Sequence, residues 1–126
     1  MVNLPHFDSA SCFPVEAMHT CFSNTAKYMA RHWSCAFFKG AGSAALQHED
    51  FNLSKPMWTA AGKDLKRANP WIPASLGRHL RDISKHINGY KATEWQEWTL
   101  LYSIPVMQGR LPPVYLKHWA RFVLAM

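Results

Sequence analysis

Hydrophobic residues in the first half of the chain recur at steps of three and four positions, which is the spacing of one face of an α-helix. Between positions 16 and 33 this face is formed by Met18, Phe22, Ala26, Met29 and Trp33. The pattern predicts a helix over 16–33. A loop or short strand with two prolines is predicted over 1–15, and a small, polar, loop-like segment over 39–52.

A second helix is predicted to begin at Ser54, because a serine side chain caps free backbone amides and Pro56 fits a first turn. Its apolar stripe is formed by Met57, Ala61 and Leu65. The helix should end near Ala68, since the residue before the proline at position 70 is pushed out of helical geometry. A proline-containing connector over 70–77 follows, and 79–87 is predicted to form a short helix.

The last two predicted helices carry aromatic side chains. One begins near Ala92, and its ridge is formed by Trp95, Trp98 and Tyr102. Pro105 should bend or end this helix, because proline lacks an amide hydrogen and clashes with the preceding turn. The other begins at Pro113, and one side of it is formed by Tyr115, Trp119, Phe122 and Val123. No alternating strand pattern occurs, so the predicted class is mainly α, with four to five helices over 16–126.

Composition and charge indicate whether the chain folds and which kind of partner it favours. Hydrophobic residues make up 48% of the chain and charged residues 17%, which predicts one folded unit and excludes a disordered segment. Fourteen Lys and Arg against eight Asp and Glu give a net charge of +6, which favours polyanionic partners such as nucleic acid. Six Trp in so small a chain leave open an exposed apolar patch, the mark of a missing partner or domain.

Several classes of function lack their sequence signatures. The cysteines Cys12, Cys21 and Cys35 follow no CxxC spacing, which indicates neither a disulfide framework nor a zinc ribbon. No signal-peptide pattern and no long apolar run occur, so we expect a nuclear or cytoplasmic protein with no membrane partner. A Gly-rich phosphate loop, a GxSxG elbow and an HExxH motif are missing, and we expect no small-molecule substrate.

Acidic residues on two predicted helices are candidates for chemistry. Glu16 stands at a loop-to-helix boundary, with His19 one turn further along. A carboxylate there is favoured by the helix dipole, and an oxygen ligand beside an open cleft suits Mg²⁺. The alternative is a charge that stabilises the helix start beside an incidental histidine. Glu94 and Glu97 lie on the helix with the aromatic ridge, where either one carboxylate points inward or both are exposed.

Two basic clusters are candidates for contacts to phosphates, which Arg and Lys make without sequence preference. The first cluster is Lys63, Lys66 and Arg67, and the second is Arg78, Arg81 and Lys85 on the predicted short helix. The alternative for both is a solvated face, lightly paired through Asp64 and Asp82. His79 and His86 are too far apart in sequence to indicate a zinc site.

Three segments, in this order, resemble the transposases of CACTA-type (En/Spm-like) elements. The segment LPHFDSASCFPVEAMHTCFSNTAKYMARHW is similar to the family's phenylalanine-proline-isoleucine-aspartate-x-methionine-histidine segment and its following helix. PWIPASLGRHLRDI is similar to the family's Pro-rich Gly-Arg stretch. YKATEWQEWTLLYSIPVMQGRLPPVYLKHWARFV is similar to its Trp-rich helices. The resemblance covers most of the chain.

The resemblance implies the α-rich part of a ribonuclease-H-like domain, in which acidic residues hold two Mg²⁺ ions for DNA strand cleavage and transfer. Glu16 stands where the family usually has Asp, and Ala17 where it often has Pro. Glu94 lies in the helix expected to bring the last acid. The resemblance therefore implies that Glu16, His19 and Glu94 are catalytic, that Glu16 and Glu94 bind metal, and that DNA is the partner.

The resemblance also implies missing parts. The first acidic strand of such a domain is expected upstream of Met1, and the last predicted helix is still amphipathic at Met126. We therefore expect a single partial domain over 1–126, the fragment of a transposase, which is inactive without its other domains. The alternatives are a small helical module that binds DNA or an acidic protein without catalysis, and a pseudogene product without function.

Overall fold

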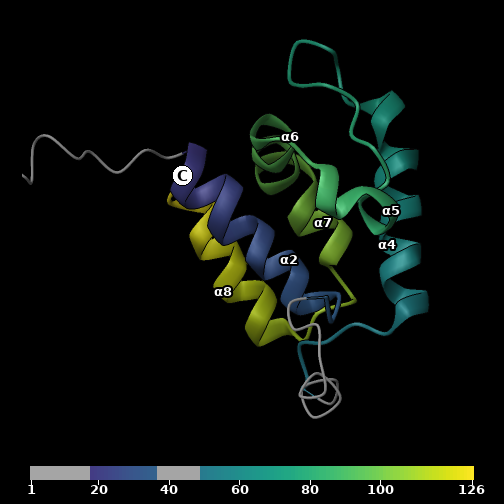
Figure 1. Ribbon diagram of the computed structural model, residues 1–126, viewed down its shortest axis with the longest axis vertical. Coiled ribbons are helices and arrows are strands. Elements are labelled where there is room, and N and C mark those ends of the chain that lie inside the picture. Colours follow the sequence, from purple (N-terminus) through teal and green to yellow (C-terminus); the bar gives the residue numbers. More distant parts are fainter. Residues whose placement is uncertain (1–17, 37–48) are drawn as a thin grey trace, which may run out of the picture.

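The computed structural model describes residues 18–36 and 49–126, and helices joined by short loops make up most of these residues (Figure 1). No strand occurs in the described ranges, so the expected mainly α class is confirmed there. The loop or strand expected over 1–15 lies outside the described residues. No helix in the described part is both long and apolar enough to cross a bilayer.

The first predicted helix is present as two continuous segments, the π-helix η1 (Met18–Ala26) and α2 (Lys27–Trp33). Its buried side is formed by Phe22, Ala26, Ala30 and Trp33; Ala30 was not part of the predicted face, and the predicted Met18 and Met29 are only partly buried. The backbone carbonyls at the end of α2 accept hydrogen bonds from residues 52 and 53. Asn52 Nδ2 donates to the His32 carbonyl at 2.7 Å, and the Leu53 N–H donates to the Trp33 carbonyl at 2.8 Å.

Helix α4 (Lys55–Ala68) has the bounds that its local sequence predicts. Ser54 is the N-cap, and its Oγ accepts from the Met57 N–H at 3.4 Å. The predicted stripe is wrong at its first position, because Met57 is 37% exposed. The buried stripe is formed by Trp58, Ala61, Gly62 and Leu65. A stripe that begins at Trp58 has the same helical spacing and buries the larger aromatic side chain.

The short helix predicted over 79–87 is shorter in the structure. After the 3₁₀ turn η2 (Asn69–Trp71) the chain is irregular until α5 (Ile83–His86), which continues into the 3₁₀ turn η3 (Ile87–Gly89). Asp82 caps α5, since its Oδ1 accepts from the Ser84 N–H at 2.9 Å. The residues before Asp82 are held by contacts outside the helix, which sequence spacing alone does not reveal.

The aromatic ridge lies on one continuous helical stretch made of α6 (Ala92–Glu97), the π-helix η4 (Trp98–Tyr102) and α7 (Ser103–Met107). Pro105 does not end the stretch, which stops two residues later. The wider π turn lies directly before the proline, where the missing amide hydrogen and the ring disturb the regular bonding ladder. Trp95, Trp98 and Tyr102 are buried, as predicted.

The last helix, α8 (Pro113–Leu124), begins at the predicted proline and lies antiparallel beside α2 (Figure 1). Trp119 joins α8 to the rest of the core. Its ring lies edge-on against Trp33, with centroids 5.1 Å apart, and its Nε1 donates to Ser103 Oγ at 2.7 Å. Ser103 Oγ in turn donates to the Thr99 carbonyl at 2.7 Å. The core is therefore a tryptophan cluster with a satisfied polar group at its centre.

Candidate nucleic-acid interface

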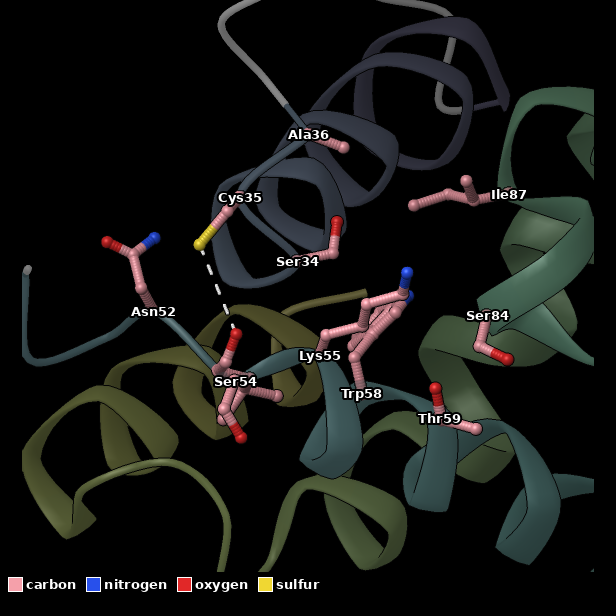
Figure 2. Close-up of a pocket in the computed structure, with 11 residues that line it drawn as sticks. Ser34, Cys35, Ala36, Asn52, Ser54, Lys55, Trp58, Thr59, Ser84 and Ile87 are labelled. Carbon is pink, nitrogen blue, oxygen red and sulfur yellow. Dashed lines mark hydrogen bonds between the residues drawn. The ribbon is translucent and has the colours of Figure 1, made fainter. Parts of the chain in front are cut away.

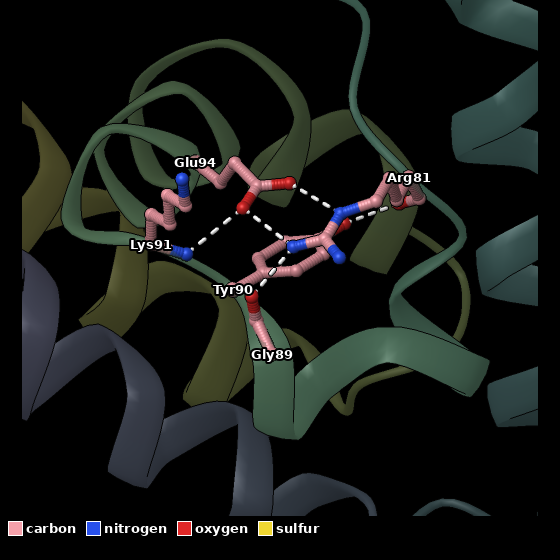
Figure 3. Close-up of polar contacts among 5 residues, drawn as sticks. All are labelled: Arg81, Gly89, Tyr90, Lys91 and Glu94. Carbon is pink, nitrogen blue, oxygen red and sulfur yellow. Dashed lines mark hydrogen bonds and ion pairs between the residues drawn. The ribbon is translucent and has the colours of Figure 1, made fainter.

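Glu94, an expected metal ligand, is bound by Arg81 in the structure (Figure 3). Its two carboxylate oxygens accept from Nε and Nη2 of Arg81, each at 2.7 Å, and Oε2 also accepts from the Lys91 N–H at 2.8 Å. The hydrogen bonds from Arg81 lower the pKa of Glu94, and those to Glu94 raise the pKa of Arg81. The Arg81 guanidinium occupies both oxygens, neutralises the carboxylate and repels a further cation, so this arrangement disfavours Mg²⁺ at Glu94.

Arg81 is held from three further directions. Its Nη2 donates to the Gly89 carbonyl at 2.6 Å, and its guanidinium lies over the ring of Tyr90, 5.6 Å from the centroid. The Tyr90 hydroxyl donates to the Arg81 carbonyl, and burial raises the pKa of that hydroxyl. Arg81, expected to contact DNA, therefore closes the loop between α5 and α6.

Of the other two expected catalytic residues, only His19 lies in the described ranges. His19 lies on η1, is exposed, and already has a partner. Glu16 lies outside the described residues. Within the described ranges, no group of three or more His, Cys, Asp and Glu side chains is placed to hold a metal ion. The metal-binding roles of Glu16 and Glu94 therefore stay a prediction, and we derive no chemistry through Mg²⁺.

Each carboxylate between positions 55 and 126 has an internal partner. Besides Glu94, Asp64 forms an ion pair with Arg110. Asp82 caps α5, and Oε1 of Glu97 accepts from the Arg78 N–H at 3.0 Å. Negative charge in this part of the chain is thus used to hold helices and loops together, which leaves the outward charge of the surface strongly positive.

The first predicted basic cluster, Lys63, Lys66 and Arg67, lies on the exposed side of α4. Helix α4 forms one edge of the molecule, with α5 and α7 on its inner side (Figure 1). Arg67 Nη1 lies 3.5 Å from Asp64 Oδ1, but the Arg67 side chain is 81% exposed, so this pair is weak. Lys63 and Lys66 have no carboxylate within ion-pair distance among the described residues.

The second predicted cluster does not form a stripe on one helix, because α5 begins only at Ile83. Arg78 and Arg81 precede the helix, and Arg81 is used internally. Arg78 and Lys85 are exposed. Since α5 packs beside α4, Lys85 extends the positive charge of α4. We call the exposed cations Lys63, Lys66, Arg67, Arg78 and Lys85 the basic face.

A clamp centred on Asn69 lies next to the basic face, and the sequence analysis did not identify it. The buried Asn69 side chain donates from Nδ2 to the Leu80 carbonyl at 2.8 Å, and its Oδ1 accepts from the Leu80 N–H at 3.1 Å. The Tyr102 hydroxyl donates to the same Oδ1 at 3.0 Å. An amide side chain offers one donor group and one acceptor, which match one backbone residue. The clamp therefore brings the two ends of the segment 70–79 together.

A cavity of about 590 Å³ lies between the end of α2 and the start of α4 (Figure 2). Cys35 on its wall has a left-handed backbone, with φ 58°, and its Sγ lies 4.0 Å from the Leu53 carbonyl oxygen. Burial raises the pKa of the Cys35 thiol, which keeps it protonated and weakly nucleophilic at neutral pH. The Cys35 thiol is therefore not an activated nucleophile.

Comparisons of the chain with family models, with curated proteins and with solved structures find no match in any of the three. The transposase resemblance and the DNA partner thus stay predictions. The described residues offer exposed cations on α4, before α5 and on α5, which together make up the basic face, and in the described ranges they offer no cluster of side chains that could hold a metal ion.

Proposed function

We propose that this chain is a nucleic-acid-binding module that contacts phosphates through the basic face and performs no strand cleavage itself. The observation that carries the proposal is the division of charge: carboxylates between 55 and 126 bind internal partners, while lysines and arginines of α4 and α5 point outward. Exposed cations that have no acidic partner, or only a weak one as Arg67 has in Asp64, attract a polyanion and release its counterions on binding.

The proposal keeps the DNA partner that the transposase resemblance implies and leaves out the catalysis. Glu94 is bound by Arg81, which explains its position without a metal ion. A helical segment that supplied phosphate contacts would suit a larger transposase, whose acidic residues would come from elsewhere. The binding itself needs no other domain, because phosphates are contacted from the surface of α4.

Salt dependence of binding tests this proposal. The chain is titrated into fluorescently labelled duplex and single-stranded DNA at several salt concentrations, and anisotropy gives the binding constants. We expect log K to fall linearly with log salt. Replacing Lys63, Lys66 and Arg67 by Ala should weaken binding to both polymers and reduce the slope by about 0.9 for each lost contact to duplex DNA.

A matched control removes the same kind of charge elsewhere. Lys117 and Arg121 are exposed on α8, a helix that carries none of the basic-face residues. Replacing both by Ala should leave the slope nearly unchanged. If the α8 variant weakens binding as much as the α4 variant, net charge and not the basic face determines binding. If neither DNA binds, the proposed function is wrong.

A further inference from the structure

We infer that the nucleic acid is single-stranded and that one of its bases stacks on Trp71. This inference rests on the proposed function and names its substrate class. Trp71 differs from every other tryptophan of the chain. The other five are at most 7% exposed and form or adjoin the core, whereas Trp71 is 85% exposed. The fold gains little from this ring, which leaves both of its faces available to a ligand.

The position of Trp71 is fixed although its ring is exposed. The residue ends the turn η2, directly after the clamp residue Asn69. Ile72, next in sequence, packs against the core. Further along, Gly77 lies so close to α6 and η4 that a Cβ there would be 3.3 Å from atoms of Glu97 and Leu101. A ring on an anchored segment loses little conformational entropy on binding, which favours affinity.

The surroundings of Trp71 select a polyanion. Residues 65–81 contain no Asp or Glu. Lys66 and Arg67 precede the ring, and Arg78 follows it, all exposed. The clamp joins Asn69 to Leu80, so the two ends of the loop that carries Trp71 meet. The cations before and after Trp71 therefore lie near that same point. An exposed aromatic ring flanked by cations combines base stacking with phosphate contacts, as in proteins that bind single strands.

A single strand fits this arrangement better than a duplex does. In a duplex the faces of the bases are covered by their neighbours, and a protein reaches the phosphates and the base edges. A single strand offers its bases for stacking, and every base has a face that stacks. A protein partner without acidic side chains would lack a role for the cations around Trp71, and an acidic protein partner is one outcome of the test.

The test compares three substitutions of Trp71 on two ligands. The ligands are an oligothymidylate of about twelve nucleotides and a duplex of equal length, measured by anisotropy. Trp71→Phe keeps an aromatic face, Trp71→Leu keeps an apolar side chain without one, and Trp71→Ala removes both. We expect Trp71→Ala and Trp71→Leu to weaken oligothymidylate binding about tenfold, Trp71→Phe to weaken it less, and duplex binding to stay unchanged. Thermal unfolding should be nearly the same for all, because the ring is exposed.

A second readout follows the ring itself. Because the other tryptophans are buried, acrylamide quenches mainly the fluorescence of Trp71, and oligothymidylate should protect it. If Trp71→Leu binds as tightly as the natural chain, or if the duplex protects the ring equally, the stacking inference is overturned while the basic-face proposal stands. If the variant with Ala in place of Lys63, Lys66 and Arg67 binds both ligands as tightly as the natural chain does, the proposed function is overturned. Binding of neither ligand to the natural chain overturns both.

Discussion

Gly62 on α4 lies directly against the carboxylate of Asp82: a Cβ at position 62 would be 2.0 Å from Oδ1 of Asp82 and 2.8 Å from Oγ of Ser84. Glycine is a poor helix former in the middle of a helix. Here it allows the capped start of α5 to approach α4, which brings the helix that carries Lys85 close to the cations of α4. The two helices can lie this close only because Gly62 has no side chain.

The first prediction concerns this approach. Gly62→Ala should destabilise the protein by about 1–3 kcal/mol, because the added methyl group forces α5 away and outweighs the better helix propensity of alanine. Urea unfolding measures the change. In a background with Asp82→Ala the same substitution should cost less, since the nearest atom, Asp82 Oδ1, has been removed and Ser84 Oγ at 2.8 Å remains. Equal costs in both backgrounds would show that Asp82 is not the obstacle.

The clamp at Asn69 gives the second prediction. Asn69→Asp should destabilise the protein by about 1–3 kcal/mol, because the amide donor to the Leu80 carbonyl becomes a carboxylate oxygen facing that carbonyl. Chemical denaturation measures the loss. Asn88→Asp is the matched control, since Asn88 is exposed and accepts a hydrogen bond from Arg31 at 2.9 Å. A similar effect at both positions would contradict the special role of Asn69.

The third prediction is a pH dependence at Glu94. The hydrogen bonds from Arg81 lower the pKa of Glu94 in the folded state. A lowered folded-state pKa gives stability that is fully present above the unfolded-state pKa and is lost as pH falls through the folded-state value. Glu94→Gln should therefore have a lower melting temperature than the natural chain at neutral pH, and the difference should shrink in acid.

Circular dichroism melts at a series of pH values measure this difference. Glu49→Gln is the control, because Glu49 is exposed, and its difference from the natural chain should be small throughout. If the Glu94→Gln difference is the same at neutral pH and in strong acid, the ion pair with Arg81 does not stabilise the fold. Metal-dependent nicking of supercoiled DNA that disappears in Glu94→Gln would instead support the metal role that the resemblance implies.

The fourth prediction concerns the polar group inside the tryptophan cluster. Trp119→Phe removes the Nε1 donor to Ser103 Oγ and part of a buried ring, so it should cost about 2–4 kcal/mol. Thermal or urea unfolding measures the loss. Trp71→Phe, the same exchange at an exposed position, should change stability by less than about 0.5 kcal/mol. Comparable losses at the two positions would contradict the burial described for Trp119.

The sequence predicts those helix ends that local residues determine. Ser54 caps α4 through its own side chain, and the proline at position 70 follows the last turn closely. The start of α5 was misplaced because Leu80 bonds to Asn69, eleven residues away. A side chain that replaces a backbone partner leaves no periodic signal in the sequence. Pro105 was predicted to bend or end its helix, and the helical stretch continues past it to Met107, after a π turn over Trp98–Tyr102.

In the candidate site, too, local sequence predicts some features, and others depend on tertiary contacts. The exposed side of α4 follows from helical spacing, so Lys63, Lys66 and Arg67 were predictable as surface cations. Whether a cation has a partner depends on tertiary contacts, and Arg81 is bound by Glu94 for that reason. Tryptophan is a core residue by composition, which gives no indication that Trp71 is exposed.

The order of residues at the clamp also affects how the molecule ages. An asparagine loses its amide when the nitrogen of the next peptide bond attacks the side chain, and this attack requires a hydrogen on that nitrogen. Pro70 has none, so Asn69 is protected by its neighbour as well as by burial. Asn88 is exposed and followed by Gly89, which gives it neither protection. Slow deamidation should therefore begin beside Arg31 and leave intact the amide that presents Trp71.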